Sequence, residues 1–207
     1  FDGTKNNLYN TDSKKYAQKE VSYQNAYTNI VHLFKGGKAS ASETWIYIEG
    51  IGTKRNKTDY LEGYAFGSGE TGIKPRVREA FHKIIGALGA PHQLIVFNVF
   101  GFSRGAAAAR HFIHEAKSNP ARFSGWWLTK SQVMVNFVGL FDTVSSYEES
   151  LGKNFDNDVL ELHLNFREGY ANKVFHLAAL DEYRENFSLT TIDSARNLEF
   201  GYEMYIP

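Results

Sequence analysis

The sequence contains no cysteine, no excess of either charge and no long apolar run. The absence of cysteine excludes a thiol nucleophile, a thiolate metal site and a disulfide framework, but it leaves the cellular compartment open. Lys plus Arg number 23 and Asp plus Glu number 23, so the formal net charge is zero. This balance argues against a protein that binds nucleic acid or anionic membranes through a basic surface. Without a run of about 18 apolar residues, the sequence predicts no transmembrane segment.

The composition that remains is typical of a folded domain. Of the 207 residues, 43% are hydrophobic and 15% are aromatic, which is too apolar for a disordered tail. This length fits one domain with a substantial core. The chain starts at Phe1, with no Met or signal peptide, and stops at Pro207 inside a predicted strand. We therefore expect residues 1–207 to be a single domain, incomplete at both ends.

Runs of β-branched and aromatic residues predict the strands of a sheet. Four such runs cover residues 44–48, 94–100, 133–141 and 174–180, and 199–206 is a plausible fifth. Phe1 is interpreted as the last residue of a further strand. Nearly continuous apolarity favours strands covered on both faces, as in a parallel sheet.

Segments with helical spacing lie between these runs. They cover residues 22–34, 73–88 and 104–116, with a weaker candidate at 158–166, and the polar stretches 35–43 and 50–72 are predicted loops. Strands that alternate with helices predict a three-layer α/β/α sandwich with a mostly parallel sheet.

The strongest functional signal is the pentapeptide Gly101-Phe102-Ser103-Arg104-Gly105, which matches G-x-S-x-G. It follows a predicted buried strand and opens an alanine-rich helix, the setting of a nucleophile elbow. Glycines on either side of the serine let strand and helix pass closely. The N–H of Arg104, at the helix N-terminus, is predicted to face an oxyanion. The alternative is a glycine-rich turn whose serine only caps the helix.

A nucleophilic serine needs a base and an acid that orients it. Asp142 ends the strand 133–141 and is predicted to lie on the same sheet edge as Ser103, although it could simply cap the following loop. Two histidines follow it: His163, expected on the surface of a helix, and His176, in the middle of a predicted strand and so more typical of a satisfied core residue. The base is better placed after the strand 199–206, so we expect the catalytic histidine beyond Pro207, with His176 as a fallback.

Five motifs occur along the chain in the order of a known family. They are Phe1-Asp2-Gly3-Thr4-x-Asn6-Asn7, Tyr47-Ile48-Glu49-Gly50-Ile51-Gly52-Thr53, Gly101-Phe102-Ser103-Arg104-Gly105-Ala106, Val138-Gly139-Leu140-Phe141-Asp142-Thr143-Val144 and His176-Leu177-Ala178-Ala179-Leu180-Asp181-Glu182-x-Arg184. Together they resemble the α/β-hydrolase domain of type VI secretion lipase effectors, a family of antibacterial phospholipases. The resemblance covers nearly the whole chain. It implies attack on acyl esters of glycerophospholipids by a Ser–Asp–His triad, with Ser103 and Asp142 as the matching residues.

The resemblance also implies how such a protein works. The family's catalytic histidine lies in a segment that follows a strand resembling 202–207, which this sequence does not include. The amides of Gly3 or Thr4 would complete the oxyanion hole with that of Arg104, unless Gly3 serves only a tight turn, and Asp2 would brace the elbow. The expected partners are a phospholipid at a membrane surface, an immunity protein and a delivery protein of the secretion apparatus. The expected location is the periplasm or membrane of a target bacterium, reached by secretion, and neither a cofactor nor a metal is implied.

Three other patterns carry weaker signals. The segment 67–72 matches G-x-G-x-x-G, but no strand leads into it and no ribose-binding acid follows, so we interpret it as a loop. His111 and His114 lie on one helix without a third ligand, so we expect one to pack on the sheet and the other to face solvent. Trp126-Trp127-Leu128 is interpreted as a hydrophobic patch under a loop, with membrane contact or an acyl-chain pocket as alternatives.

These observations favour a serine hydrolase, specifically a phospholipase A toxin. The elbow specifies acyl transfer but not the leaving group, so an esterase or thioesterase with a soluble acyl substrate is the enzymatic alternative. A catalytically inactive hydrolase fold, kept as a binding module, is the alternative from another class.

Overall fold

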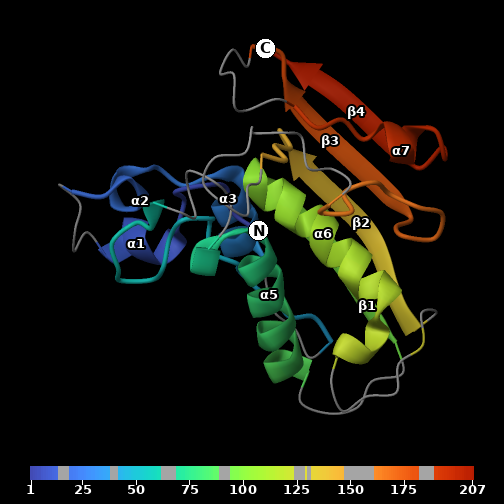
Figure 1. Ribbon diagram of the computed structural model, residues 1–207, viewed down its shortest axis with the longest axis horizontal. Coiled ribbons are helices and arrows are strands. Elements are labelled where there is room, and N and C mark those ends of the chain that lie inside the picture. The colour runs from blue at the N-terminus through green and yellow to red at the C-terminus, as the bar shows by residue number, and fades with distance from the viewer. Residues whose placement is uncertain are drawn as a thin grey trace.

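The sheet of the protein contains four parallel strands in the described part of the chain (Figure 1). The computed structural model describes residues 1–13, 19–37, 42–61, 69–88, 94–123, 129, 132–146, 161–181 and 189–207. The strands are β1 (Ile95–Phe102), β2 (Val133–Phe141), β3 (Lys173–Ala179) and β4 (Gly201–Ile206), and they pair in the order β1-β2-β3-β4. This arrangement confirms the predicted parallel sheet, because four of the five predicted runs become strands that pair in chain order.

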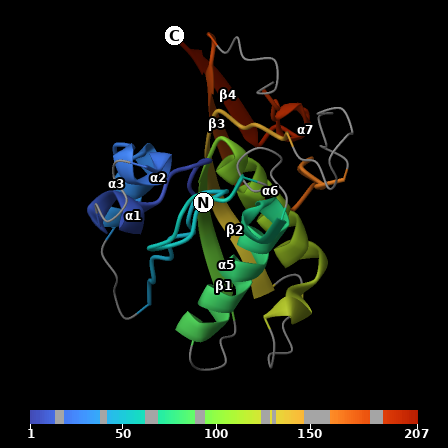
Figure 2. The ribbon, with the colours of Figure 1, turned by 60° about the vertical axis from the view of Figure 1, so that its left-hand side comes forward.

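Helices flank both faces of the sheet. They are α1 (Leu8–Ser13), α2 (Val21–Gln24), α3 (Asn29–Gly36), α5 (Ile73–Leu88), α6 (Arg104–Ser118) and α7 (Asp193–Arg196), with short 3-10 turns at Gly69–Thr71 and Pro120–Arg122. In Figure 2, α1 to α3 gather on one side of β1, and α6 lies on the other. No helix among the described residues combines the length and the apolar character needed to span a membrane.

Two apolar clusters hold these layers together. The larger lies between α5, α6 and the sheet, and it includes the four consecutive alanines 106–109, which are fully buried. Such small side chains let α6 lie close to the sheet. The smaller cluster, on the opposite face, joins α1 and α3 to Tyr47, and Phe100 and Phe102 of β1 pack against it. Alternate residues of β1 thus serve the two faces, as the pleat of a strand requires.

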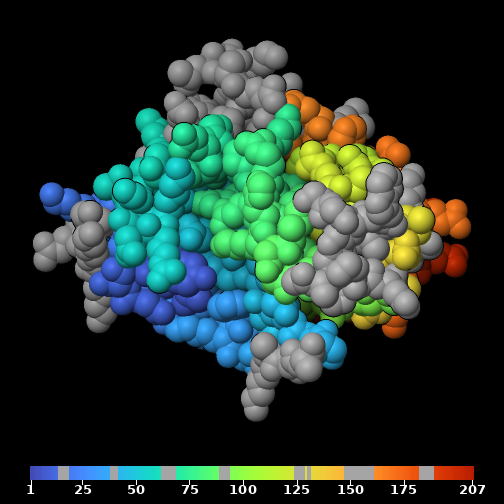
Figure 3. Space-filling model, turned by 90° about the horizontal axis from the view of Figure 1, so that it is seen from below, coloured from blue at the N-terminus to red at the C-terminus, as the bar shows by residue number. Residues whose placement is uncertain are grey.

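The segment 42–61 links α5 to the N-terminal part of the chain (Figure 3). The Lys83 Nζ of α5 donates to the Tyr47 carbonyl at 3.0 Å, and Arg76 Nη2 donates to the Gly50 carbonyl at 3.1 Å. The α5 helix therefore fixes the position of this irregular segment.

The strand predicted at 44–48 is not formed. Instead, these residues run beside Phe1 and Asp2, and the Asp2 N–H donates to the Ile48 carbonyl at 3.0 Å. Phe1 lies between this segment and β1, because the Phe102 N–H donates to the Phe1 carbonyl at 3.2 Å. A strand needs a continuous ladder of such bonds, and this short contact does not supply one.

Two helix predictions and one loop prediction need smaller corrections. The helix expected at 22–34 is split: α2 ends at Gln24, and α3 begins after Thr28, whose side chain accepts from the Val31 N–H at 3.3 Å as an N-cap. Residues 161–166, from the candidate helix 158–166, form turns instead. Of the glycine-rich segment 67–72, the described part forms the 3-10 turn before α5. Trp126-Trp127-Leu128 lies outside the described residues.

Candidate active site

Ser103 occupies the turn between β1 and α6 in a strained conformation. Its φ of 54° and ψ of −128° lie in a region that non-glycine residues rarely adopt. Ser103 is the N-cap residue of α6, yet its side chain makes no capping hydrogen bond. The capping-serine alternative therefore has no support, and the hydroxyl is not consumed by the helix.

The two glycines of the motif permit two close backbone contacts. A Cβ on Gly101 would lie 2.5 Å from the Cα of Ala106, and a Cβ on Gly105 would overlap the carbonyl oxygen of Asp2. Neither neighbour is a flexible side chain that can move away. Gly101 thus lets the strand approach its own helix, and Gly105 lets the helix approach the N-terminal segment.

One backbone hydrogen bond links the turn at Ser103 to the end of the neighbouring strand. The Ser103 N–H donates to the Phe141 carbonyl at 2.9 Å, and Asp142 follows directly. The Ser103 carbonyl in turn accepts from the Val144 N–H at 3.3 Å. Ser103 and Asp142 therefore lie at the carboxyl ends of adjacent strands, on one sheet edge.

Asp142 is held by β3 and not by its own loop. It has a positive φ of 48°, its N–H donates to the Leu177 carbonyl at 2.7 Å, and its Oδ1 accepts from the Ala179 N–H at 3.2 Å. Its Oδ2 makes no hydrogen bond to any described residue. The carboxylate is half-buried and fixed at one oxygen, which suits a group that orients a partner.

His176 is a fully buried residue in the middle of β3. Its Nε2 accepts a hydrogen bond from the Thr143 N–H at 2.9 Å, and its Nδ1 lies 3.3 Å from Glu203 Oε2. Burial lowers the pKa of His176. Both ring nitrogens are thus engaged inside the protein, so this arrangement leaves none for a proton transfer with Ser103.

The expected oxyanion donors differ in their availability. The Gly3 N–H donates to Asp2 Oδ1 at 2.8 Å, so this amide is engaged in the structure, and a contribution of Gly3 to the oxyanion hole stays a prediction. The Asp2 carboxylate captures this amide because both belong to one tight turn. The Thr4 N–H makes no hydrogen bond within the described part of the chain, and Arg104 opens α6, where helix N–H groups point outward. Arg104 and Thr4 remain the proposed donors.

Asp2 braces the N-terminal segment, and sequence reasoning missed its partners. It is buried; its Oδ1 also accepts from Thr28 Oγ1 at 2.8 Å, and its Oδ2 accepts from the Tyr47 hydroxyl at 2.5 Å. Burial raises the pKa of Asp2, and burial with the neighbouring carboxylate raises the pKa of Tyr47. Tyr47 belonged to a recognised motif, but no local pattern indicated Thr28.

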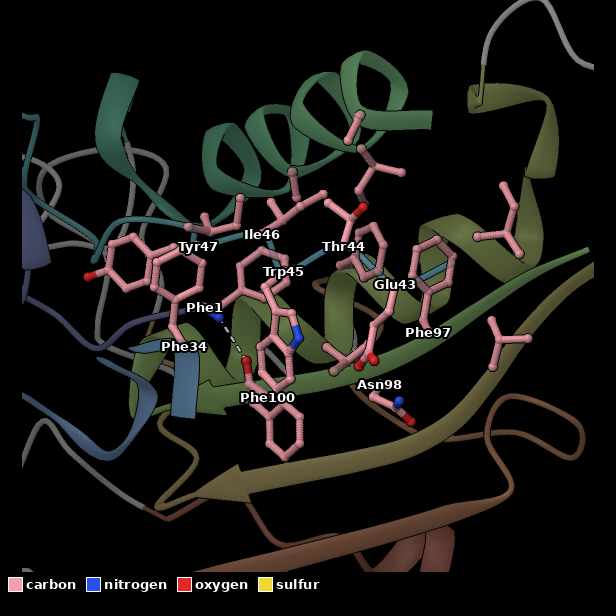
Figure 4. Close-up of a pocket in the computed structure, with 18 of the residues that line it drawn as sticks. Phe1, Phe34, Glu43, Thr44, Trp45, Ile46, Tyr47, Phe97, Asn98 and Phe100 are labelled. Carbon is pink, nitrogen blue, oxygen red and sulfur yellow. Dashed lines mark hydrogen bonds between the residues drawn. The ribbon is translucent and has the colours of Figure 1, made fainter. Parts of the chain in front are cut away.

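A cleft of about 700 Å³ runs along β1, but Ser103 does not line it. Figure 4 shows lining residues from two parts of the chain, Trp45 and Ile46 of the segment 42–61 and Phe97 and Phe100 of β1. The N atom of Phe1, another lining residue, lies 2.7 Å from the Phe100 carbonyl. This cleft belongs to the edge of β1, and we do not assign it to the substrate.

The two histidines of α6 are both buried, contrary to the expectation that one faces solvent. His111 Nδ1 lies 2.8 Å from the Leu162 carbonyl, and His114 Nδ1 lies 3.0 Å from the Tyr170 hydroxyl. The residues 161–170 cover them, and exposed His163 stacks on His114 with ring centroids 4.3 Å apart. Within the described ranges, no three His, Cys, Asp or Glu side chains gather as a metal site.

Comparisons with known proteins bear on the family and the fold. A family model described as "T6SS, Phospholipase effector Tle1-like, catalytic domain" matches residues 1–119 and 114–201. The chain is similar to a solved Tle1 effector, described as bound to the VgrG spike of the type 6 secretion system. The two are 25% identical with a TM-score of 0.63 over 100% of this chain and 48% of that chain. This likeness confirms the predicted α/β-hydrolase-like fold.

A second solved structure and a search of curated proteins add little. The structure, an uncharacterized protein from Pseudomonas aeruginosa, is 20% identical, with a TM-score of 0.31 over 58% of this chain and 18% of that chain. No curated protein matches. The chain spans about half the length of the solved Tle1 effector, since the match covers 48% of that chain.

Proposed function

Because the chain belongs to the Tle1-like family of type VI secretion phospholipase effectors, we propose that it forms the core of a serine hydrolase. Its substrates are the acyl esters of glycerophospholipids, and its activity is of the phospholipase A type. The proposal is carried by the conformation of Ser103, a strained residue whose hydroxyl does not cap its helix. Its N–H donates to the carbonyl of Phe141, the residue directly before Asp142.

In the proposed reaction, Ser103 Oγ attacks the ester carbonyl while a histidine takes its proton. The carbonyl oxygen becomes an oxyanion, stabilised by the backbone N–H groups of Arg104 and Thr4. The histidine then protonates the departing alcohol, and water hydrolyses the acyl-serine to regenerate Ser103. Asp142 orients the histidine and stabilises its protonated form through Oδ2, the oxygen that no described residue binds.

The histidine of this triad is proposed to follow β4. The strands β3 and β4 run parallel to β2, so their carboxyl ends meet on the edge that carries Asp142. A residue after β4 therefore comes within reach of this edge, whereas His176 is already engaged by Thr143 and Glu203. The proposed chemistry uses no metal and no organic cofactor.

The partners and location of the protein are proposed from the family. The Tle1 effector has a structure in complex with the VgrG spike, which supports a delivery protein of this class for the present chain. We propose that the intact protein is secreted, degrades phospholipid in the periplasm or membrane of a target bacterium, and is neutralised by an immunity protein.

The proposal is tested by measuring fatty-acid release from phospholipid vesicles by the full-length protein. Ser103→Ala should abolish release, and Ser13→Ala, an exposed serine of α1, should leave it unchanged. Hydrolysis of soluble acyl esters but not of phospholipid vesicles would support the alternative function, an esterase or thioesterase with a soluble substrate. Absence of both activities in folded protein would support a catalytically inactive fold that serves as a binding module.

A further inference from the structure

The turn after β2 depends on one side chain of β3. The Thr143 N–H is buried, and it donates to His176 Nε2 at 2.9 Å and not to a backbone carbonyl. Asp142, one residue earlier, has a left-handed φ of 48°, a conformation that is uncommon outside glycine but that aspartate adopts more readily than most residues. The imidazole therefore lies beneath the turn that presents the proposed triad acid.

The hydrogen bond to Thr143 fixes the protonation of the ring. Because Nε2 accepts, the neutral imidazole must carry its proton on Nδ1, which faces Glu203 Oε2 at 3.3 Å. Glu203 is itself held, since its Oε2 accepts from the Ile192 N–H at 2.8 Å and its Oε1 from the Tyr205 hydroxyl at 2.7 Å. A chain of bonds thus runs from β4 through His176 to the turn.

The charged groups around His176 come from three elements. Glu203 of β4 and Asp142 at the end of β2 favour a protonated ring, whereas burial and Arg110 of α6 oppose it. The Arg110 guanidinium is bound to the carbonyls of Leu164, Thr190 and Thr191 at 2.8 to 3.1 Å. Burial is the largest influence and lowers the pKa of His176, so the ring remains an acceptor. A protonated ring would direct an N–H at the Thr143 N–H.

We propose that His176 is a positioning residue of the proposed reaction: by accepting the Thr143 N–H at Nε2, it sets the turn that aims the Asp142 carboxylate. This inference rests on the proposed function for its effect on turnover, but its effect on the turn is independent of it. His176 does not touch the substrate, and the geometry assigns it a role distinct from that of the triad base.

Two substitutions distinguish a role of His176 as hydrogen-bond acceptor from a role as catalytic base. In His176→Gln, the amide oxygen reaches the place of Nε2 and can accept from Thr143, whereas the shorter side chain of His176→Asn reaches only the place of Nδ1. Both are compared in the full-length protein with His82→Asn, a change of an exposed histidine on α5. The readouts are kcat and KM on phospholipid vesicles and deuterium exchange of the peptide covering 141–146.

We expect His176→Asn to lower kcat at least tenfold, with KM within twofold of wild type, and to speed exchange in 141–146. His176→Gln should keep kcat within threefold and exchange unchanged. A wild-type kcat in His176→Asn would overturn the inference, as would a Gln variant that is folded but as slow as Asn. If the His176→Asn variant does not fold, the His176→Gln variant alone decides. Near-wild-type turnover of that variant supports the inference, and an unfolded or tenfold slower variant overturns it.

The two proposals fail in different ways. If the wild-type protein releases no fatty acid, the proposed function fails, and exchange alone decides the positioning role. The role of His176 in the turn is then supported if 141–146 exchange faster in His176→Asn and at the wild-type rate in His176→Gln. Unchanged exchange in His176→Asn overturns it.

Discussion

Gly105 of α6 packs directly on the carbonyl oxygen of Asp2, leaving no room for a Cβ between them. This contact joins α6, the helix that follows Ser103, to the N-terminal segment that supplies Thr4. Because residue 105 has no side chain, the candidate nucleophile and part of its proposed oxyanion hole can lie close together.

We predict that Gly105→Ala destabilises the protein by about 1–3 kcal/mol, because overpacking against backbone cannot be relieved by a rotamer change. The matched control is Gly86→Ala in α5, where a Cβ meets nothing within 4 Å. That change should stabilise the protein by up to about 1 kcal/mol, through the helix propensity of alanine. Urea denaturation measures both, and equal effects of the two substitutions would contradict the packing account.

The acid of the proposed triad is tested by Asp142→Asn and Asp142→Ala. Asparagine tolerates the positive φ of this position and keeps the bond from the Ala179 N–H, but it loses the charge that orients a histidine. We expect turnover to fall at least about a hundredfold in either variant, by analogy with damage to other triads, while the protein stays folded. Circular dichroism checks folding, and wild-type rates in either folded variant would remove Asp142 from the mechanism.

Removing the Tyr47 hydroxyl should destabilise the folded state, because buried Asp2 loses a hydrogen-bond donor. In Tyr47→Phe, the Asp2 carboxylate loses one of its hydrogen bonds, at a cost of about 1–3 kcal/mol. Tyr202→Phe, at an exposed ring of β4, is the control and should cost nothing measurable.

The cost of Tyr47→Phe should depend on pH. Burial raises the pKa of Asp2 in the folded state, so the folded state binds more protons than the unfolded state and Asp2 stabilises less as pH rises. Losing a hydrogen bond to the ionised form raises that pKa further. Denaturation at pH 5 and pH 8 should show the larger loss at pH 8; a loss that is larger at pH 5 would reverse this account.

His114 should make the protein less stable in mild acid. Burial, with His163 stacked beside it, lowers the pKa of His114 from 6.5 to about 4. The unfolded state therefore binds more protons between these values, and stability falls as pH drops from 6.5 towards 4. His114→Phe should show a shallower fall over this window in denaturant titrations. An equal slope in both proteins would show that other groups cause the acid sensitivity.

Much of the sheet was predictable because the signals are local. The runs that became β1, β2 and β3 are rich in apolar residues, although Val96, Met134 and Phe175 are exposed in the structure. The turn at Ser103 is marked by its own glycines and alanines. The segment 44–48 has the same composition as these strands, but strand formation depends on a ladder partner that lies elsewhere in the chain. The break between α2 and α3 depends likewise on Thr28, whose side chain is bound to Asp2.

The finer features of the candidate site could not be predicted from sequence. The use of the Gly3 amide by Asp2 is a matter of turn geometry, although both residues lie in a recognised motif. The role of His176 depends on the register of β3 against β2, which brings its ring under Thr143. A histidine inside a strand indicates burial, but it does not indicate which backbone group the ring will bind.

Covalent labelling of the full-length protein with a fluorophosphonate decides whether Ser103 is a nucleophile. We expect one adduct, located by mass spectrometry on the peptide that contains Ser103, lost in Ser103→Ala and kept in Ser13→Ala. Folded wild-type protein that takes up no label, or takes it up on another residue, would show that Ser103 is not the nucleophile.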